Sequence, residues 1–207
     1  MKRVLCAIFV FVLPAFAAIS QRQAPVSQWN STSSSTCSAQ LGSNYQPGDL
    51  IVVWTFWATG SSPNALTAGV SDSLNTYLSA VGPTVQPSAS NAAAQIFYVK
   101  STANGSPPLI KVTYYLNGVQ TNANTSGCVF VEYQGADIVS PLDSVSEAIS
   151  TTANATLDSG TASPANASLL MFGAGTWDGG SLVAGGELHQ RAGQRRQYHG
   201  AVHSDRS

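Results

Sequence analysis

Short apolar runs of seven to ten residues recur along the chain, and clusters of Gly, Pro, Asn and Ser separate them. Runs of this length, rich in Val, Ile, Tyr, Phe and Trp, are typical of β-strands. No stretch keeps an apolar repeat of 3.6 residues between helix caps, so we expect helices to be minor. The runs are GDLIVVWTFW at 48–57, TYLSAVG at 76–82, AQIFYVKS at 94–101, LIKVTYYLN at 109–117, CVFVEYQG at 128–135 and SLLMFGAGTW at 168–177, with weaker candidates at 143–150 and 155–163.

The run at 109–117 shows the clearest alternation, which is the pattern of a strand with one buried face. One face carries Ile110, Val112, Tyr114 and Leu116, and the other carries Lys111, Thr113, Tyr115 and Asn117. We therefore expect the first face to enter a core and the second to meet water. Six to eight such strands, without alternating helices, predict an all-β protein, an antiparallel β-sandwich of immunoglobulin-like or jelly-roll type.

The first 17 residues have the layout of a secretory signal peptide. Lys2 and Arg3 precede the apolar run VLCAIFVFVLPAF, and Ala15 and Ala17 form the small-residue pattern read by signal peptidase. The run is too short to span a bilayer stably. We expect cleavage near Ala17 or Ala18 and a secreted or cell-surface protein that meets the membrane only through this peptide; a retained N-terminal anchor is the alternative.

Charged residues are scarce, and this excludes one class of partner. Residues 22–186 hold three basic and eight acidic side chains, which is 11 charges in 165 positions. So few cations cannot neutralise a phosphate backbone, and we do not expect nucleic acid as a partner. Solubility must come instead from the abundant Ser, Thr, Asn and Gln.

Two cysteines, Cys37 and Cys128, remain after the expected cleavage. In an oxidising compartment such a pair is more often bridged than free, so we expect a disulfide between them. Two isolated thiols are the alternative. A metal site is not expected, because neither a CxxC motif nor a neighbouring histidine accompanies them.

Composition divides the chain into four parts. The signal peptide at 1–17 is followed by a lead-in at 18–45, which is rich in Ser, Thr and Gln and which we expect to be a linker or loosely ordered. The β-sandwich domain covers 46–186. A basic segment of different composition occupies 187–207.

The aromatic run at 48–57 supplies the first candidate for a binding site. We expect a central strand with both faces covered and with Trp54 packed in the core, because Trp54 and Phe56 share a face with apolar neighbours and Trp57 lies on the opposite face. The alternative is a ligand-binding platform of Trp57, Tyr115 and Trp177 on which a sugar ring stacks.

The acidic residues and histidines give little support to catalysis. Carboxylates beside turn residues usually cap their own turns, and a calcium site is the alternative for this set, which comprises Asp72, Asp137, Asp143 and Asp178. A hydrolase would need two acidic groups in one cleft, such as Glu132 and Asp143. No histidine precedes His189, and no motif for a nucleophile, a metal or a cofactor occurs in a convincing context, so we expect no enzyme and no cofactor.

The order of the segments carries a resemblance to a known family. The succession GDLIVVW, VSDSLNTYLSAVGPT, AQIFYVKS, KVTYYLN, VFVEYQGADIVSPLDS and SLLMFGAGT resembles a β-sandwich domain of secreted, mostly uncharacterised bacterial proteins that is frequent in Acidobacteria. The resemblance spans about residues 48–175 and contains no catalytic segment. It implies a β-sandwich and an exported location, and no enzyme activity. The turn SLN at 73–75 departs from the family, whose turn carries an additional glycine.

The last 21 residues, ELHQRAGQRRQYHGAVHSDRS, hold all three histidines and four of the nine basic residues. Read one nucleotide later with suitably chosen codons, this segment can encode SFTSGPGNGVNTMEQFIQIG, which is similar to the family's ending. We therefore hypothesise a frameshift after about residue 186, so that the sandwich lacks its last strand or two. The alternatives are a genuine basic tail that binds an anionic surface or polysaccharide, and an ordinary exposed terminus.

Together these features predict a secreted, non-catalytic β-sandwich module for extracellular or cell-surface interaction. The alternatives are a carbohydrate-binding module that uses exposed aromatic residues and, less favoured, an extracellular hydrolase. The partner itself is not named by any motif, although a polysaccharide or another cell-surface component suits the composition.

Overall fold

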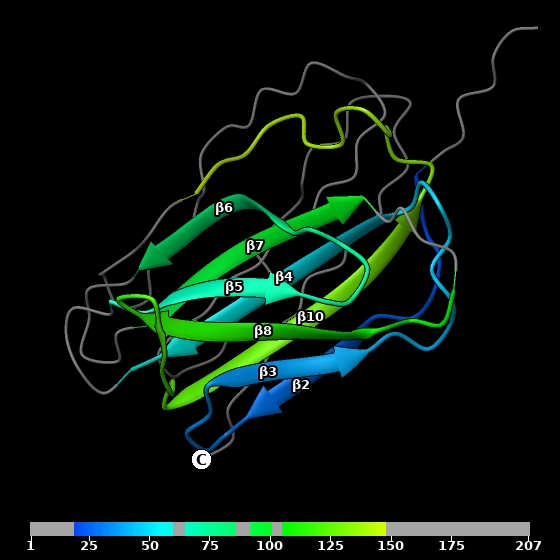
Figure 1. Ribbon diagram of the computed structural model, residues 1–207. Helices are drawn as coiled ribbons and strands as arrows, with labels where there is room; N and C mark the ends of the chain where they lie inside the picture. Colours follow the sequence, from blue (N-terminus) through cyan, green and yellow to red (C-terminus); the bar gives the residue numbers. More distant parts are fainter. Residues whose placement is uncertain (1–18, 60–64, 86–91, 101–104, 148–207) are drawn as a thin grey trace, which may run out of the picture.

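The computed structural model describes residues 19–59, 65–85, 92–100 and 105–147, and this part of the chain is all-β (Figure 1). It contains ten strands and no helix. The strands are β1 (Ser20–Gln21), β2 (Val26–Asn30), β3 (Thr36–Gln40), β4 (Leu50–Ala58), β5 (Thr67–Ser71), β6 (Leu78–Val85), β7 (Ala92–Lys100), β8 (Leu109–Leu116), β9 (Val119–Gln120) and β10 (Thr125–Gln134).

The strands form two antiparallel sheets that pack against each other. The larger sheet has the order β1-β10-β4-β7-β6, and β2 also pairs with β10; the smaller has the order β3-β8-β5, and β9 pairs with β8. Figure 1 shows β5, β8 and β3 as one layer across β7, β4 and β10. The prediction of an antiparallel β-sandwich is confirmed.

The space between the sheets is filled by apolar side chains from both layers. Ile51, Val53 and Trp57 of β4 meet Ile110, Val112 and Tyr114 of β8 in this core. The other face of β4 is also buried, in a second cluster around Trp54 and Phe56. The predictions that both faces of this strand are covered and that Trp54 is packed in a core are therefore confirmed. Trp57 is the tryptophan that lies between the two sheets.

The alternation in β8 correctly predicts which side chains face the core, with two exceptions. Ile110, Val112 and Tyr114 are fully buried, and Lys111 is exposed. Leu116 is exposed at the end of the strand, and Thr113 is buried although its face was expected to meet water. The ring of Tyr115 lies against Gly69, which pairs with Thr113 and has no side chain to hold the ring away.

The lead-in at 18–45 is not a linker in its described part, which begins at Ile19, and that expectation was wrong. It contains β1, β2 and β3, which are edge strands of the two sheets. Their apolar residues are few but packed: Val26 and Cys37 lie on the core between the sheets, and Trp29 packs on the second cluster. Ser, Thr and Gln at the remaining positions suit half-exposed edges, which is why composition alone suggested a linker.

A disulfide between Cys37 and Cys128 confirms the expected pairing. Cys37 lies on β3 and Cys128 on β10, so the bond joins the two sheets across the core; the two Cα atoms are 6.1 Å apart. The cysteines are separated by 91 positions. Closing a loop of that length stabilises a fold by about 4 to 5 kcal/mol in the chain-entropy treatment.

Four of the five strongly patterned runs before residue 140 correspond closely to long strands, β4, β7, β8 and β10, and the run at 76–82 overlaps β6. The strand β5 was not expected, because TAGVS holds few large apolar residues. Residues 141–147 form no strand. The expected strands at 155–163 and 168–177 and the segment 187–207 lie outside the described residues, so the frameshift hypothesis stays a prediction.

Candidate functional site

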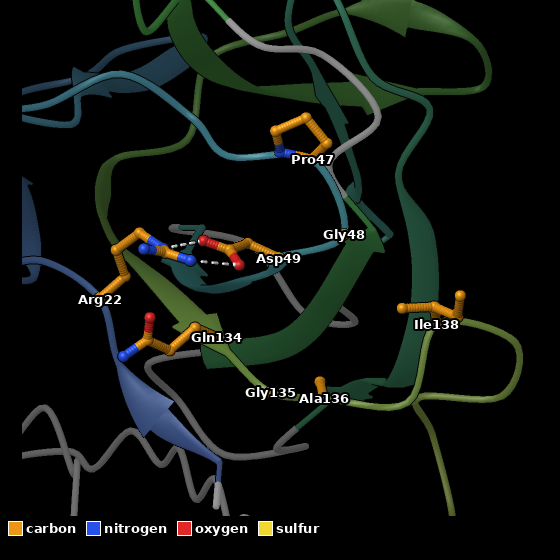
Figure 2. A pocket seen from close by; sticks show the side chains of 8 residues that line it. All are labelled: Arg22, Pro47, Gly48, Asp49, Gln134, Gly135, Ala136 and Ile138. Carbon is orange, nitrogen blue, oxygen red and sulfur yellow. Dashed lines mark hydrogen bonds and ion pairs between the residues drawn. The ribbon is translucent and has the colours of Figure 1, made fainter. Parts of the chain in front are cut away.

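An open pocket lies at one end of the larger sheet, where β4 begins and β10 ends. Its volume is about 480 Å³, and it is lined by Arg22, Pro47, Gly48, Asp49, Gln134, Gly135, Ala136 and Ile138. In Figure 2, Arg22 and Ile138 lie on opposite sides of the pocket, with Gly135 and Ala136 along the edge between them. The pocket is open rather than enclosed, so a ligand held there would keep part of its surface in contact with water.

Two glycines shape the pocket because they allow the chain to turn at the strand ends. Gly48 has a φ of 83° and precedes β4, and Gly135 has a φ of 81° and follows β10. Residues with a Cβ rarely adopt these angles. The side chain of Ile138 packs close to Gly48. A Cβ atom placed on Gly48 would lie 3.7 Å from Ile138 Cγ2, which is an ordinary van der Waals distance.

The charged groups of the pocket form a fork-shaped ion pair. Arg22 donates from Nη2 to Asp49 Oδ1 at 3.0 Å and from Nε to Asp49 Oδ2. The side chain of Asp49 is 5% exposed, whereas that of Arg22 is 33% exposed. Hydrogen bonding to Asp49 raises the pKa of the Arg22 guanidinium above its ordinary value. Arg22 therefore stays charged, and its partly exposed side chain lines the pocket.

Glu132 lies behind this ion pair and is fully buried. Its Oε2 accepts a hydrogen bond from the Gln23 amide, and its Oε1 accepts one from the backbone N–H of Gln46 at 3.3 Å. Burial is the main reason that the pKa of Glu132 is raised, and nearby Asp49 raises it further. The N-terminal segment thus supplies the polar partners for two buried carboxylates of the sandwich.

The described surroundings of Glu132 do not support the hydrolase alternative. A hydrolytic pair needs two carboxylates that face each other across a cleft reached by substrate and water. Glu132 is instead enclosed and bound by Gln23 and Gln46, and its carboxylate neighbour is Asp49, which is paired with Arg22. Asp143 lies in the segment after β10 and has an interaction of its own.

Two of the acidic residues expected to cap turns do so. Asp72 Oδ1 accepts hydrogen bonds from the backbone N–H groups of Leu74 and Asn75, both at 2.7 Å. Asp137 Oδ1 accepts from Val139 N at 2.7 Å and from Ser140 N at 3.2 Å. These backbone bonds lower the pKa of Asp137. Asp178 lies outside the described residues.

The alternative of an aromatic platform is not supported by the position of Trp57. Trp57 is fully buried between the sheets, with its ring centroid 5.6 Å from that of Tyr114. Tyr115 lies half-buried on the outer face of the smaller sheet, so the two rings are on different sides of that layer. Trp177 lies outside the described residues. Trp57 is on the inward face of β4 because the strand's alternation places it with Ile51 and Val53.

No sequence pattern predicted the pocket, because the residues that line it are distant from one another in the sequence. Arg22 is 27 positions from Asp49. Arg22 fell in the segment predicted to be a linker, and Asp49 fell at the start of a predicted strand. The only available signal was that Arg22 is one of three basic residues in positions 22–186. No group of three or more His, Cys, Asp or Glu side chains in the described ranges could hold a metal ion.

Comparison with known proteins adds no assignment for this site. No family model, curated protein or solved structure matches the chain. Within the part of the chain that the structure describes, no helix could cross a membrane.

Proposed function

We propose that the protein is a secreted, non-catalytic β-sandwich module that binds an extracellular or cell-surface component. The observation that carries this proposal is the disulfide between Cys37 and Cys128, which joins the two sheets. Structural disulfides persist mainly in oxidising compartments outside the cytosol. The signal-like leader at 1–17 and the uncharged polar composition support the same location.

The engagement of the acidic residues supports a non-catalytic role. Asp49 and Glu132 are buried and hydrogen-bonded at the end of the sandwich that holds the pocket, and Asp72 and Asp137 cap turns. Glu147 accepts a hydrogen bond from the hydroxyl of Thr84. Carboxylates bound in this way stabilise the fold, and they are poorly placed to exchange protons with a substrate.

The pocket beside β4 and β10 supports a binding role. It combines a partly exposed arginine, an amide and an aliphatic wall within one open concavity. Polar groups set in a partly apolar concavity are typical of sites that bind small molecules or the ends of larger ones.

Export tests the first half of the proposal. The whole gene would be expressed in a bacterium with a general secretory route, and the protein would be recovered from each cell fraction. We expect the exported form to begin at Ala18 or Ile19 and to react with no thiol reagent after denaturation. An uncleaved cytoplasmic protein with two free thiols in its sandwich would contradict the proposal.

Binding tests the second half. The purified oxidised protein would be incubated with isolated bacterial cell envelopes and sedimented with them. We expect saturable retention that excess unlabelled protein displaces. A protein that stays in the supernatant at every envelope concentration would contradict an interaction role.

A further inference from the structure

The pocket lined by Arg22, Asp49, Gln134 and Ile138 carries an inference about the class of ligand, and this inference rests on the proposed binding role. We propose that the pocket binds an uncharged sugar residue, with its hydroxyl groups on Arg22 and Gln134 and its ring on Ile138. This site differs from the aromatic platform, whose Trp57 is buried.

The charges of the pocket favour a neutral ligand. Among the described residues that line it, Arg22 and Asp49 are the charged ones, and they neutralise each other. Glu132 lies close enough to raise the pKa of Arg22, so the surroundings hold no excess positive charge. An anion would compete with Asp49 for the guanidinium and would be repelled by its carboxylate. A cation would compete with Arg22 in the same way.

The hydrogen-bonding groups of the pocket match hydroxyl groups. A guanidinium has five N–H donors, and Asp49 takes two of those of Arg22. The amide nitrogen of Gln134 donates to Ser20 Oγ at 2.9 Å, which leaves its amide oxygen as an acceptor. Donors and an acceptor are therefore offered together, and a hydroxyl group both accepts and donates.

The opposite wall supplies apolar contact for a ring. Ile138 is 62% exposed although it is a large aliphatic residue, and Pro47 and Ala136 also line the pocket. In Figure 2, Ile138 faces Arg22 across the pocket. A sugar ring has the same division, because its edge carries hydroxyl groups and its faces carry C–H groups. The exposed Ile138 would lose contact with water on binding.

The test titrates the oxidised protein with single sugars and follows binding by saturation-transfer NMR and calorimetry. The probes are glucose, galactose, mannose and N-acetylglucosamine, with glucuronate as the acidic counterpart. We expect at least one neutral sugar to bind. Ile138→Glu should weaken that binding by at least about tenfold, because it removes the apolar wall and adds a charge beside Asp49.

Val139→Glu is the matched control, since Val139 is the next residue, is 87% exposed and does not line the pocket. It should leave sugar binding within about twofold of the original. Arg22→Lys keeps the positive charge but loses the planar guanidinium with its several N–H donors. It should weaken sugar binding, while the near-ultraviolet circular dichroism spectrum should show that the core is intact.

Three outcomes would overturn the inference: none of the neutral sugars binds, glucuronate binds more tightly than all of them, or Ile138→Glu binds like the original. If sugars fail but the protein and its Ile138→Glu variant are still retained on cell envelopes, the interaction role stands and the pocket is not its site. If retention also fails, both proposals are contradicted.

Discussion

At the scale of single residues, buried polar groups shape the end of the sandwich that holds the pocket. Glu132 is fully buried, and Gln23 and the backbone of Gln46 hold its carboxylate. The sequence predicted the turn-capping roles of Asp72 and Asp137, because a cap lies next to the turn it holds. The sequence could not predict the burial and hydrogen bonding of Glu132, because the partners of its carboxylate come from segments that only the folded chain brings together.

Glu132→Gln should change how stability depends on pH. A carboxyl whose pKa is raised by folding contributes stability fully below its unfolded pKa, and this contribution is lost as pH rises through the folded pKa. The free energy of unfolding of the variant, relative to the original, should therefore increase as the pH rises from the unfolded pKa of about 4 through the raised folded pKa. Urea unfolding at several pH values measures it, and a flat difference would contradict the burial of Glu132.

Asp137→Asn provides a control of opposite sign. The pKa of Asp137 is lowered by its bonds from Val139 and Ser140, so its contribution is present above the unfolded pKa and is lost as pH falls. The free energy of unfolding of the variant should be lower than that of the original at neutral pH, and this difference should disappear in acid. The same slope for both variants would show that the pH dependence has another origin.

Gly127→Ala should destabilise the larger sheet. A Cβ at this position would lie 2.2 Å from Phe56 Cε1 and 3.1 Å from Trp29 Cε3, and the Phe56 ring is itself packed against Trp29. Overfilling a packed site costs about 1 to 3 kcal/mol, which urea unfolding would detect. Gly42→Ala is the matched control, since its Cβ would meet only Gln23 Oε1 at 3.9 Å. Equal effects of the two changes would contradict this packing.

At the scale of elements, strong patterns predicted the interior strands and failed at the edges. The strands β4, β8 and β10 are long and rich in large apolar residues, so periodicity and composition agree there. The strands β2 and β3 have the sequences VSQWN and TCSAQ, in which polar residues interrupt the apolar ones because each strand lies at a partly exposed edge. Their strand character comes from pairing with β10 and β8, which a single sequence does not reveal.

Deleting residues 19–25 should destabilise the sandwich much more than the removal of so short a segment would suggest. The deletion removes β1 and takes the hydrogen-bonding partners from Asp49 and Glu132. Leaving a buried polar group without its partner costs about 1 to 3 kcal/mol, and more when the group is charged. Urea unfolding of the shortened protein, compared with one beginning at Ile19, measures the loss. Equal stability would mean that Arg22 and Gln23 do not stabilise the buried carboxylates.

At the scale of the whole molecule, the disulfide and the N-terminal strands join parts of the chain that are far apart in the sequence. The strands β1 and β2 pair with β10, and Cys37 of β3 is bonded to Cys128 of β10. The sheet order therefore requires both ends of the described chain to be in place. The pocket depends on this arrangement as well, since Arg22 follows β1 and Gln134 ends β10.

Removing the disulfide should weaken the whole sandwich. In a Cys37→Ala and Cys128→Ala double variant the unfolded chain regains the freedom of a loop between residues 91 positions apart. We expect a loss of about 4 to 5 kcal/mol in the free energy of unfolding. The reduced original protein should match the variant in urea unfolding. A loss below about 1 kcal/mol would contradict the constraint that the bond places on the unfolded chain.

Hydrogen exchange of the oxidised protein, followed by mass spectrometry, tests most directly whether the N-terminal segment is part of the sandwich. The bond to Cys128, the hydrogen bond from Gln23 to Glu132 and the place of Arg22 in the pocket all depend on residues 20–40. Backbone amides bonded in a sheet exchange slowly, whereas those of a linker exchange at once. We predict that peptides from β2 and β3 are protected together with those from β4 and β10. Immediate exchange throughout 20–40, with protection in β4 and β10, would contradict the fold and the pocket built on it.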